Sequence, residues 1–387
     1  MQLINSGRRV LALVSVVFAA LLGGGAGALL GTCGPFTDTA NDAFCPLILE
    51  VYYLAITTGT TPTTYDPASN VTRTQMAAFL SRTVDGVLKR GSRRAALNQF
   101  WALQTTTFFD VTTVGDLAGF PASDGLDVWV PNFTPGTVSR VRAGDGRVLE
   151  TWTGAVFALG ALSALGSIFV TGNTFPGSLY RIDPRMPAGV VTTVASNLGN
   201  DSYHLTFDGG RIWTTNSSSV SIVTPGLSTP WSVTTVTTGL AVPTGALFDG
   251  TNVWVTDSGP GTLLRLNSSG AVLQTVTVGS APRAAVFDGA NIWVPNASSN
   301  SVSVVRALNG VVLATLTGSG LSLPFQAAFD GERILVTNQG GGGSVSLWKA
   351  ADLTAIGNLL TGGSAVFACS DGANFWFTLR GNQLARF

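Results

Sequence analysis

The stretch Asp288-Gly289-Ala290-Asn291-Ile292-Trp293-Val294-Pro295-Asn296 decides how most of this 387-residue chain folds. A turn-forming Asp-Gly pair precedes a short apolar strand signal, and an asparagine ends it. The position of Trp293 returns at residues 129, 169, 213, 254, 293, 335 and 376, at steps of 40, 44, 41, 39, 42 and 41 residues. Six copies keep the Asp-Gly pair, and a degenerate copy without aspartate begins at Gly166.

A period of about 40–45 residues with four strand signals per unit is typical of a β-propeller. One unit shows the four signals at 284–287, 291–294, 301–305 and 311–316. Because glycine accepts positive φ, we expect a tight hairpin at each Asp-Gly pair, and we expect the repeated tryptophans to fill the space between sheets. The sequence therefore predicts an all-β, seven-bladed β-propeller over 102–387, preceded by a small N-terminal helical module.

The last unit ends at residues 383–387, which correspond to the third strand of a blade. A ring with an incomplete sheet exposes a strand edge. We therefore expect the missing outermost strand to come from before the first Asp-Gly pair, at residues 103–109. The repeated aspartates and the asparagines after each tryptophan strand are predicted to bond their own turns. A ring of ligand-binding asparagines is the alternative.

Composition excludes several classes of function. Only 11% of the residues are charged, against about 25% in an average domain, and 21 basic residues balance 21 acidic ones. This balance gives no electrostatic attraction toward nucleic acid. With one histidine in the whole chain, no multi-histidine metal site can form, and no metal or cofactor is predicted.

The first residues predict export. Arg8 and Arg9 precede an apolar run over 10–22, and Ala26-Gly27-Ala28 fits a cleavage site, so residues 1–28 are predicted to be a signal peptide. An uncleaved anchor is the alternative, because the run extends to 21 residues when it is counted through Leu30. In an oxidising compartment Cys33 and Cys45 pair or stay as buried thiols, and Cys369 is predicted to be an inert core thiol.

Residues 33–88 are predicted to form a helical module, followed by a basic linker over 89–101. Apolar spacing predicts a helix over 45–54, and Thr72 with Gln75 is a capping-box pattern that opens a second helix over 76–87. The module resembles one S-layer homology module in the segments Phe36-Thr37-Asp38, Gly59, Tyr65-Asp66-Pro67 and 71–82. The resemblance implies non-covalent attachment to secondary cell-wall polysaccharide, with Arg73 helping to bind the sugar. Gln75 stands where the family pattern has Glu, and family members commonly carry three modules.

The propeller repeats resemble the YVTN family and the repeats of the virginiamycin B lyases, through Leu335-Val336-Thr337-Asn338 and 371–378. The lyase resemblance implies a metal-assisted site of histidine and glutamate near the channel. The predicted ring holds only His204, Glu150 and Glu332 of these types, and none has a partner in a repeat-equivalent position. The resemblance therefore predicts the fold and does not predict the activity.

Residues that enter the innermost strands line one mouth of the predicted channel. Aligned by their distance to Asp-Gly, they are Tyr203, His204, Thr244, Arg283, Phe325 and Gln326. Histidine and arginine supply hydrogen-bond donors, and Tyr203 and Phe325 supply stacking surface for a sugar or aromatic ligand. The alternative is that these side chains only pack.

Three functional hypotheses follow. In the first, an exported cell-surface protein is anchored to cell-wall polysaccharide, and its propeller binds an unidentified protein or glycan without catalysis. In the second, the propeller is a lyase-like or glycan-cleaving enzyme that uses His204 with Arg283. In the third, the chain assembles with copies of itself into a surface array. A histidine beside a carboxylate in an open channel favours the enzyme.

Overall fold

The structure is a computed structural model that describes residues 35–39, 44–53, 57–80 and 110–387. The chain divides into two compact units, with the boundary between Phe100 and Trp101. The predicted signal peptide, residues 1–28, and the predicted linker, residues 89–101, lie outside the described residues. In the described part of the chain, no helix is long and apolar enough to cross a membrane.

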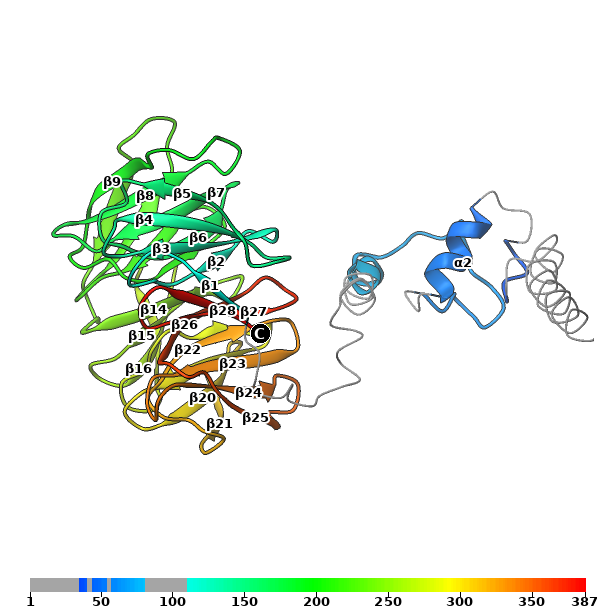
Figure 1. Cartoon of the computed structure of the whole chain (residues 1–387). Coiled ribbons are helices and arrows are strands. Elements are labelled where there is room, and N and C mark those ends of the chain that lie inside the picture. The colour runs from blue at the N-terminus through cyan, green and yellow to red at the C-terminus, as the bar shows by residue number, and fades with distance from the viewer. Residues whose placement is uncertain (1–34, 40–43, 54–56, 81–109) are drawn as a thin grey trace, which may run out of the picture. The chain divides into compact units, whose positions relative to one another are not determined.

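The second unit consists of seven antiparallel four-stranded sheets, as predicted (Figure 1). From the first strand outward, they are β2 (Ala122–Ser123), β3 (Asp127–Asn132), β4 (Thr137–Arg142) and β5 (Val148–Thr153); β6 (Ala158–Ala164), β7 (Ser167–Gly172), β8 (Gly177–Ile182) and β9 (Thr192–Leu198); β10 (Leu205–Phe207), β11 (Ile212–Thr215), β12 (Val220–Thr224) and β13 (Ser232–Val236); β14 (Pro243–Phe248), β15 (Val253–Asp257), β16 (Thr262–Leu266) and β17 (Val272–Thr277); β18 (Val286–Phe287), β19 (Asn291–Asn296), β20 (Ser301–Arg306) and β21 (Val312–Leu316); β22 (Pro324–Phe329), β23 (Arg333–Asn338), β24 (Ser344–Lys349) and β25 (Ala355–Leu360); and β26 (Ala365–Ser370), β27 (Phe375–Leu379), β28 (Gln383–Arg386) and β1 (Asp110–Thr113).

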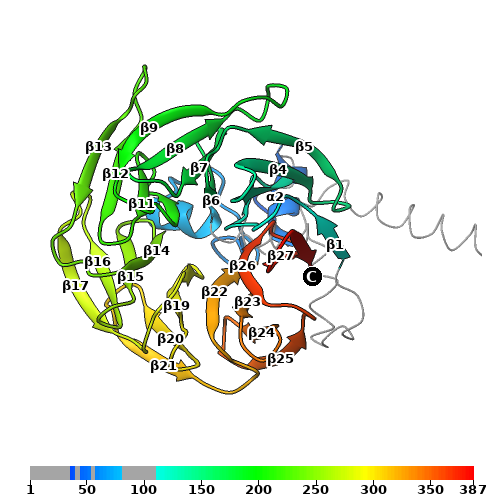
Figure 2. The same ribbon diagram turned by 60° about the vertical axis from the view of Figure 1, so that its left-hand side comes forward.

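The seven sheets close into a ring. The first strand of each sheet contacts the first strand of the next, and β26 contacts β2, so the innermost strands surround the axis of the ring, where the sequence predicts a channel (Figure 2). Each of the first six sheets is a simple meander, and neighbouring strands are antiparallel in all seven. The turns between first and second strands and those between third and fourth strands therefore lie at one end of the ring, which we call the turn end. The other connections lie at the opposite end, which we call the mouth face.

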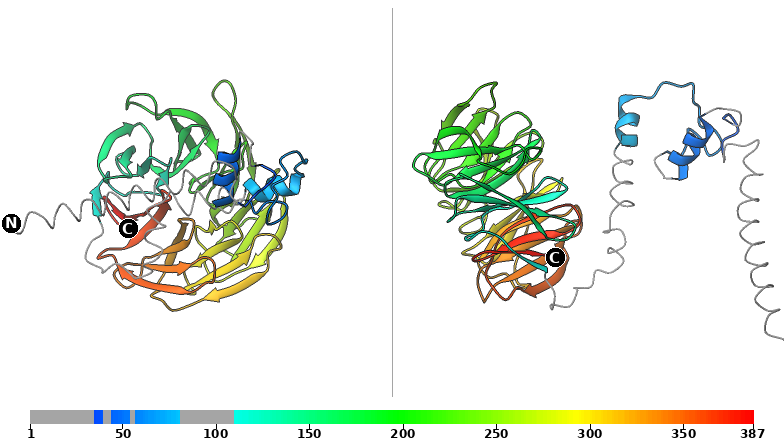
Figure 3. Two further views of the ribbon diagram at one scale, coloured as in Figure 1. Left: turned by 90° about the vertical axis from the view of Figure 1, so that its right-hand side faces the viewer. Right: turned by 45° about the horizontal axis from the view of Figure 1, so that its top comes forward.

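The two ends of the propeller meet in the seventh sheet. Strand β1 pairs with β28, so that Val111 lies opposite Ala385 and Thr113 opposite Gln383 (Figure 3). The prediction that a strand from before the first Asp-Gly completes the last sheet is confirmed. Its position was wrong: the pairing strand is Asp110–Thr113, and residues 103–109 lie outside the described residues. The outermost strand of a sheet exposes one face, so a polar segment such as Asp-Val-Thr-Thr is suited to that place.

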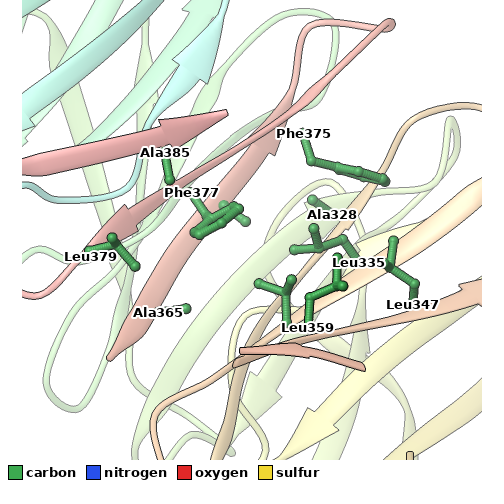
Figure 4. Packing of buried hydrophobic residues seen from close by; sticks show 11 residues of the cluster. Ala328, Leu335, Leu347, Leu359, Ala365, Phe375, Phe377, Leu379 and Ala385 are labelled. Carbon is green, nitrogen blue, oxygen red and sulfur yellow. The ribbon is translucent and has the colours of Figure 1, made fainter. Parts of the chain in front are cut away.

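Seven apolar cores hold the ring together, one between each pair of neighbouring sheets. Figure 4 shows the core between the sixth and seventh sheets, where Phe375 and Phe377 lie against Leu335, Leu347 and Leu359. The repeated tryptophans at 129, 213, 254, 293 and 376 are fully buried in these cores. No sheet buries both faces alone, so closure of the ring completes every core.

A repeated hydrogen bond links each of five Asp-Gly turns to its tryptophan. In the fourth sheet, the Asp249 carboxylate accepts from the Trp254 indole at 2.6 Å and from the backbone amides of Thr251 and Asn252. The same indole bond joins Asp124 to Trp129, Asp208 to Trp213, Asp288 to Trp293, and Asp371 to Trp376. The connection is a four-residue turn rather than the expected tight Asp-Gly hairpin, and Gly250 takes a φ of 94° within it.

The asparagines after the tryptophan strands also bond locally, as predicted. Asn296 is fully buried and donates to the hydroxyls of Ser301 and Ser303 on the next strand. Asn132, Asn216 and Asn338 make the equivalent pair of bonds. The amide nitrogens of these asparagines are engaged inside their own sheets, which argues against the alternative of a ligand-binding ring.

In the first unit, the described segments contain the helix α2 (Cys45–Tyr53) and a helical stretch over 73–80. The Phe36 ring is fully buried and packs against Tyr52 and Tyr65 at centroid distances of 5.1 and 5.5 Å. The predicted capping box is present. The side-chain oxygen of Gln75 accepts from the backbone amide of Thr72, and the backbone amide of Gln75 donates to the Thr72 hydroxyl.

The cysteines differ between the two units. Cys45 is disulfide-bonded, and Cys33, its predicted partner, lies outside the described residues. Cys369 is a free thiol that packs against the core between the seventh and first sheets. Burial raises the pKa of the Cys369 thiol, which agrees with the predicted inert role.

Candidate functional site at the channel mouth

The residues predicted to line the channel mouth lie where the chain enters the first strands of the third to sixth sheets. Tyr203 and His204 precede β10, Arg283 precedes β18, and Phe325 and Gln326 lie at the start of β22. Neighbouring entries pair directly, as in the parallel bridge between Ala284 and Gln326. The alignment by distance to Asp-Gly therefore selected positions that are equivalent around the channel.

The channel contains an aromatic cluster that includes two residues the sequence analysis missed. Phe120 and Phe367, from the first and seventh sheets, pack with Tyr203 and Phe325. The Phe120 ring lies 3.9 Å from that of Phe367 and 5.2 Å from that of Tyr203 between centroids. Both phenylalanines stand four residues before an Asp-Gly pair, as His204 and Gln326 do. The same spacing rule, applied to the first and last units, would have found them.

His204 is held inside the ring wall. Its Nδ1 accepts from the backbone amide of Ala246 in the next sheet at 3.4 Å, and its ring packs edge-on against Phe120 at 5.0 Å. Desolvation lowers the pKa of His204 to about 4, so the imidazole is neutral at pH 7. No carboxylate forms an ion pair with His204 in the described part of the chain.

Gln326 makes the same kind of bridge. Its Oε1 accepts from the backbone amide of Ala368, in the following sheet, at 3.0 Å. Like His204 and Ala246, this pair is separated by 42 residues, which is one repeat. Both side chains thus occupy a main-chain donor of the neighbouring blade, and this engagement limits what they can offer to a ligand.

Arg283 is the cation of the channel. Its guanidinium carbon lies 5.1 Å from the centroid of the Phe325 ring, a cation–π distance. Its Nε is buried and has no hydrogen-bond partner in the described residues. Burial raises the pKa of the Tyr203 hydroxyl, and the charge of Arg283 lies close enough to act in the opposite direction. Arg283, Phe325 and Tyr203 are therefore brought together as one group.

Charged side chains avoid the mouth face. Those on its connections and strand ends are Asp116, Asp201, Asp257, Arg283 and Arg380. Asp257 is buried and accepts from the amides of Ala241 and Val242, so its charge is satisfied within the fold. Ion pairs occur instead toward the turn end, for example between Arg211 and Asp208 and between Arg333 and Asp330. Arg283 thus stands in surroundings that are poor in charge.

The turn end holds a cavity of about 270 Å³ between the third and fourth sheets. Its lining includes the paired Asp208 and Arg211, together with Phe248 and Asn267. The Arg211–Asp208 pair uses two hydrogen bonds, at 3.1 and 2.8 Å, so both charges already have partners. Across the described residues, no group of three or more histidine, cysteine, aspartate or glutamate side chains could hold a metal ion.

Solved structures similar to this chain share its propeller fold. Virginiamycin B lyase from Staphylococcus aureus superposes with a TM-score of 0.59 at 15% identity, over 72% of this chain and 98% of the lyase. A catalytically inactive histidine-to-alanine variant of the Staphylococcus aureus enzyme, with quinupristin, gives 0.60 at 14% identity, over 72% and 99%. The WD40 β-propeller domain of Doa1 gives 0.58 at 14% identity, over 72% and 97%.

This likeness defines the class of protein by fold: a seven-bladed β-propeller that distantly resembles virginiamycin B lyase. At such identities the likeness shows the fold alone, because propellers carry many unrelated functions. No protein-family model matches the sequence, and no characterised protein matches it in sequence.

Proposed function

We propose that this chain is an exported cell-surface protein whose first unit attaches it to cell-wall polysaccharide and whose propeller is a non-catalytic binding domain. The ligand site of the propeller is the channel mouth, with Tyr203, Arg283 and Phe325 as the contact residues. His204 and Gln326 support this site by bridging neighbouring sheets.

The binding role rests on one observation: Arg283 at the mouth has no ion-pair partner among the described residues, and His204 of the same mouth is neutral and hydrogen-bonded. Arg283 lies over the Phe325 ring, and no carboxylate of the described residues forms an ion pair with it, so its charge can still pair with a ligand. General acid–base chemistry needs a group that exchanges protons near neutral pH. Desolvation holds the pKa of His204 at about 4, and its Nδ1 is occupied by the Ala246 amide. This arrangement supports recognition without catalysis.

The wall-attachment role rests on the S-layer homology resemblance, and several features of the first unit support it. The Asp38 carboxylate accepts from the amides of Tyr65 and Asp66, which ties together two segments that carry the resemblance. Arg73 follows the Thr72 cap directly and is exposed at the first turn of its helix. A guanidinium in this position suits an acidic group on a sugar polymer.

A pull-down with purified cell-wall polysaccharide tests the attachment. We expect the exported wild-type protein to be retained on the polysaccharide. The amount of Arg73→Ala retained should be at least tenfold lower. Thr74→Ala, an exposed neighbour on the same helix, is the control and is expected to bind as wild type. Equal retention of wild type and Arg73→Ala would remove the anchoring role.

A lyase-like enzyme is the second candidate, favoured by the structural likeness to virginiamycin B lyase. A histidine-to-alanine variant of that lyase is catalytically inactive, and His204 is the single histidine of this chain. Incubation of the full chain with quinupristin separates the two candidates. We expect quinupristin to remain intact by mass spectrometry, and its consumption by wild type but not by His204→Ala would establish the enzyme.

A further inference from the structure

We propose that the channel mouth binds a small organic anion, a carboxylate carried on an aromatic or similarly apolar body. This inference rests on the proposed role of the mouth as a binding site and names the chemistry of its ligand. The carboxylate would pair with Arg283, and the apolar body would lie against Phe325, Tyr203 and the rim of the mouth.

The charge of Arg283 lacks an internal partner. Its Nε is buried and makes no hydrogen bond in the described part of the chain, and no carboxylate of that part forms an ion pair with it. A buried donor without a partner is unfavourable unless something else satisfies it. The guanidinium fork matches the two oxygens of a carboxylate, and low surrounding polarity strengthens such a bond. A bound anion therefore supplies what the fold leaves out.

The surroundings of Arg283 favour an apolar ligand body. The guanidinium of Arg283 lies over the Phe325 ring. Phe325 and Tyr203 are partly exposed, and the buried rings of Phe120 and Phe367 pack against them. Aromatic rings stack with other aromatic rings and with apolar faces, and they add affinity beyond the area they bury. A sugar acid also carries a carboxylate, but its hydroxyl groups need many polar partners, which this aromatic cluster does not provide.

The rim of the mouth adds exposed apolar side chains in a repeated position. Leu117, Phe157 and Leu323 lie just before the first strands of the first, second and sixth sheets, with φ values of 51°, 50° and 49°. Asp201 and Ala281 hold the equivalent position in the third and fifth sheets, with φ values of 55° and 54°. The side chains of Leu117, Phe157 and Leu323 are 46%, 45% and 49% exposed. Their carbonyls accept from the amides of Phe133, Asn173 and Gln339, each of which directly follows the second strand of its sheet.

Bulky residues rarely adopt this left-handed conformation, and strain of this kind gathers at functional sites. The fold thus holds these large apolar residues at the rim in a left-handed backbone conformation that such residues disfavour. Leu323 stands two residues before Phe325, in the sheet next to that of Arg283, where the body of a ligand can contact it.

Titration of the full chain with three small probes tests the inference by ligand-detected NMR. Phenylacetate carries the aromatic carboxylate, phenylacetamide is its neutral analogue, and glucuronate carries the same anionic group on a sugar. We expect phenylacetate to bind at least tenfold more tightly than either of the others. Tighter binding of glucuronate, equal binding of phenylacetamide, or binding of none of the three would overturn the inference.

Variants assign the preference to Arg283. Arg283→Gln is expected to remove the preference for phenylacetate over phenylacetamide, whereas Arg283→Lys keeps the charge and retains part of it. Arg380→Gln removes an exposed arginine of the same face and is expected to bind as wild type. Thermal melts verify that each variant is folded. An unchanged preference in Arg283→Gln contradicts the inference. Wall retention through Arg73 is tested by the separate pull-down, whose result does not depend on this titration.

Discussion

The two ends of the propeller use the repeat in opposite ways. At the turn end, five sheets carry the same hydrogen bond between an aspartate and a buried tryptophan. At the mouth, the equivalent position is Tyr203, Thr244, Arg283 or Phe325, according to the sheet. Repetition at one end lets these five sheets dock on their neighbours in the same manner. Variety at the other end gives a symmetric ring an asymmetric site.

The sixth sheet shows that the turn-end device can be replaced. Leu335 stands in place of tryptophan, and the Asp330 carboxylate accepts instead from Arg333 Nε at 2.8 Å. Arg333 also lies over the Phe375 ring of the seventh sheet, at 5.2 Å from its centroid. An arginine therefore satisfies the turn carboxylate and covers an aromatic core residue.

Truncation of a turn-end tryptophan should have the largest effect on stability. Trp293 is fully buried in the core between the fifth and sixth sheets. We expect Trp293→Ala to lower the free energy of unfolding by about 3–5 kcal/mol, from lost burial and the cavity left behind. Denaturant unfolding measures this, with the largely exposed Leu308→Ala as control. A loss below 1 kcal/mol would contradict the role of the repeated tryptophan.

Removal of a turn aspartate should have an intermediate, graded effect. Asp249 accepts from two turn amides and from the Trp254 indole. We expect Asp249→Ala to cost about 2–3 kcal/mol, because a buried indole donor and two amides lose their acceptor. Asp249→Asn keeps an oxygen for the turn amides and should cost less. Equal losses in both variants would mean that the two turn-amide bonds contribute nothing and that the indole bond accounts for the whole effect.

His204 should make stability depend on pH between about 4 and 6.5. Its pKa in the folded state is lowered to about 4 from 6.5, so the unfolded chain binds the proton more readily. The stabilising effect is complete above pH 6.5 and is lost as the pH falls toward 4, by about 2 kcal/mol between pH 7 and pH 5. Unfolding at the two pH values measures it. His204→Gln, which leaves no histidine in the chain, should lose this dependence, and an identical slope in both proteins would contradict the assignment.

Gln326 should affect stability slightly and ligand preference not at all. Replacement by leucine leaves the Ala368 amide without its acceptor, for which we expect a loss of about 1 kcal/mol. Phenylacetate titration and denaturant unfolding of Gln326→Leu test both parts. A tenfold loss of phenylacetate affinity in a variant that stays stable would mean that Gln326 contacts the ligand directly and does not only bridge two sheets.

The fold was predictable from the sequence because the repeat is visible at every tryptophan position. The closing strand was misplaced because residues 103–109 are more apolar than 110–113. An outermost strand, however, needs less apolar character than a core strand, as the mostly exposed β13 shows. The mouth positions of the third to sixth sheets could be aligned because each stands at a fixed distance from Asp-Gly, whereas Phe120 and Phe367, at the same distance in the first and seventh sheets, were missed. The bridges of His204 and Gln326 were not predicted, since a contact between two repeats leaves no pattern inside one repeat.

Backbone NMR shifts during titration with phenylacetate test the contrast between the two ends most directly. We predict that the perturbed amides cluster at 201–204, 281–284 and 323–326, around Tyr203, Arg283 and Phe325. Perturbations confined to 208–211, 248–253 and 267–268 would place the ligand in the turn-end cavity. That result would contradict binding at the channel mouth.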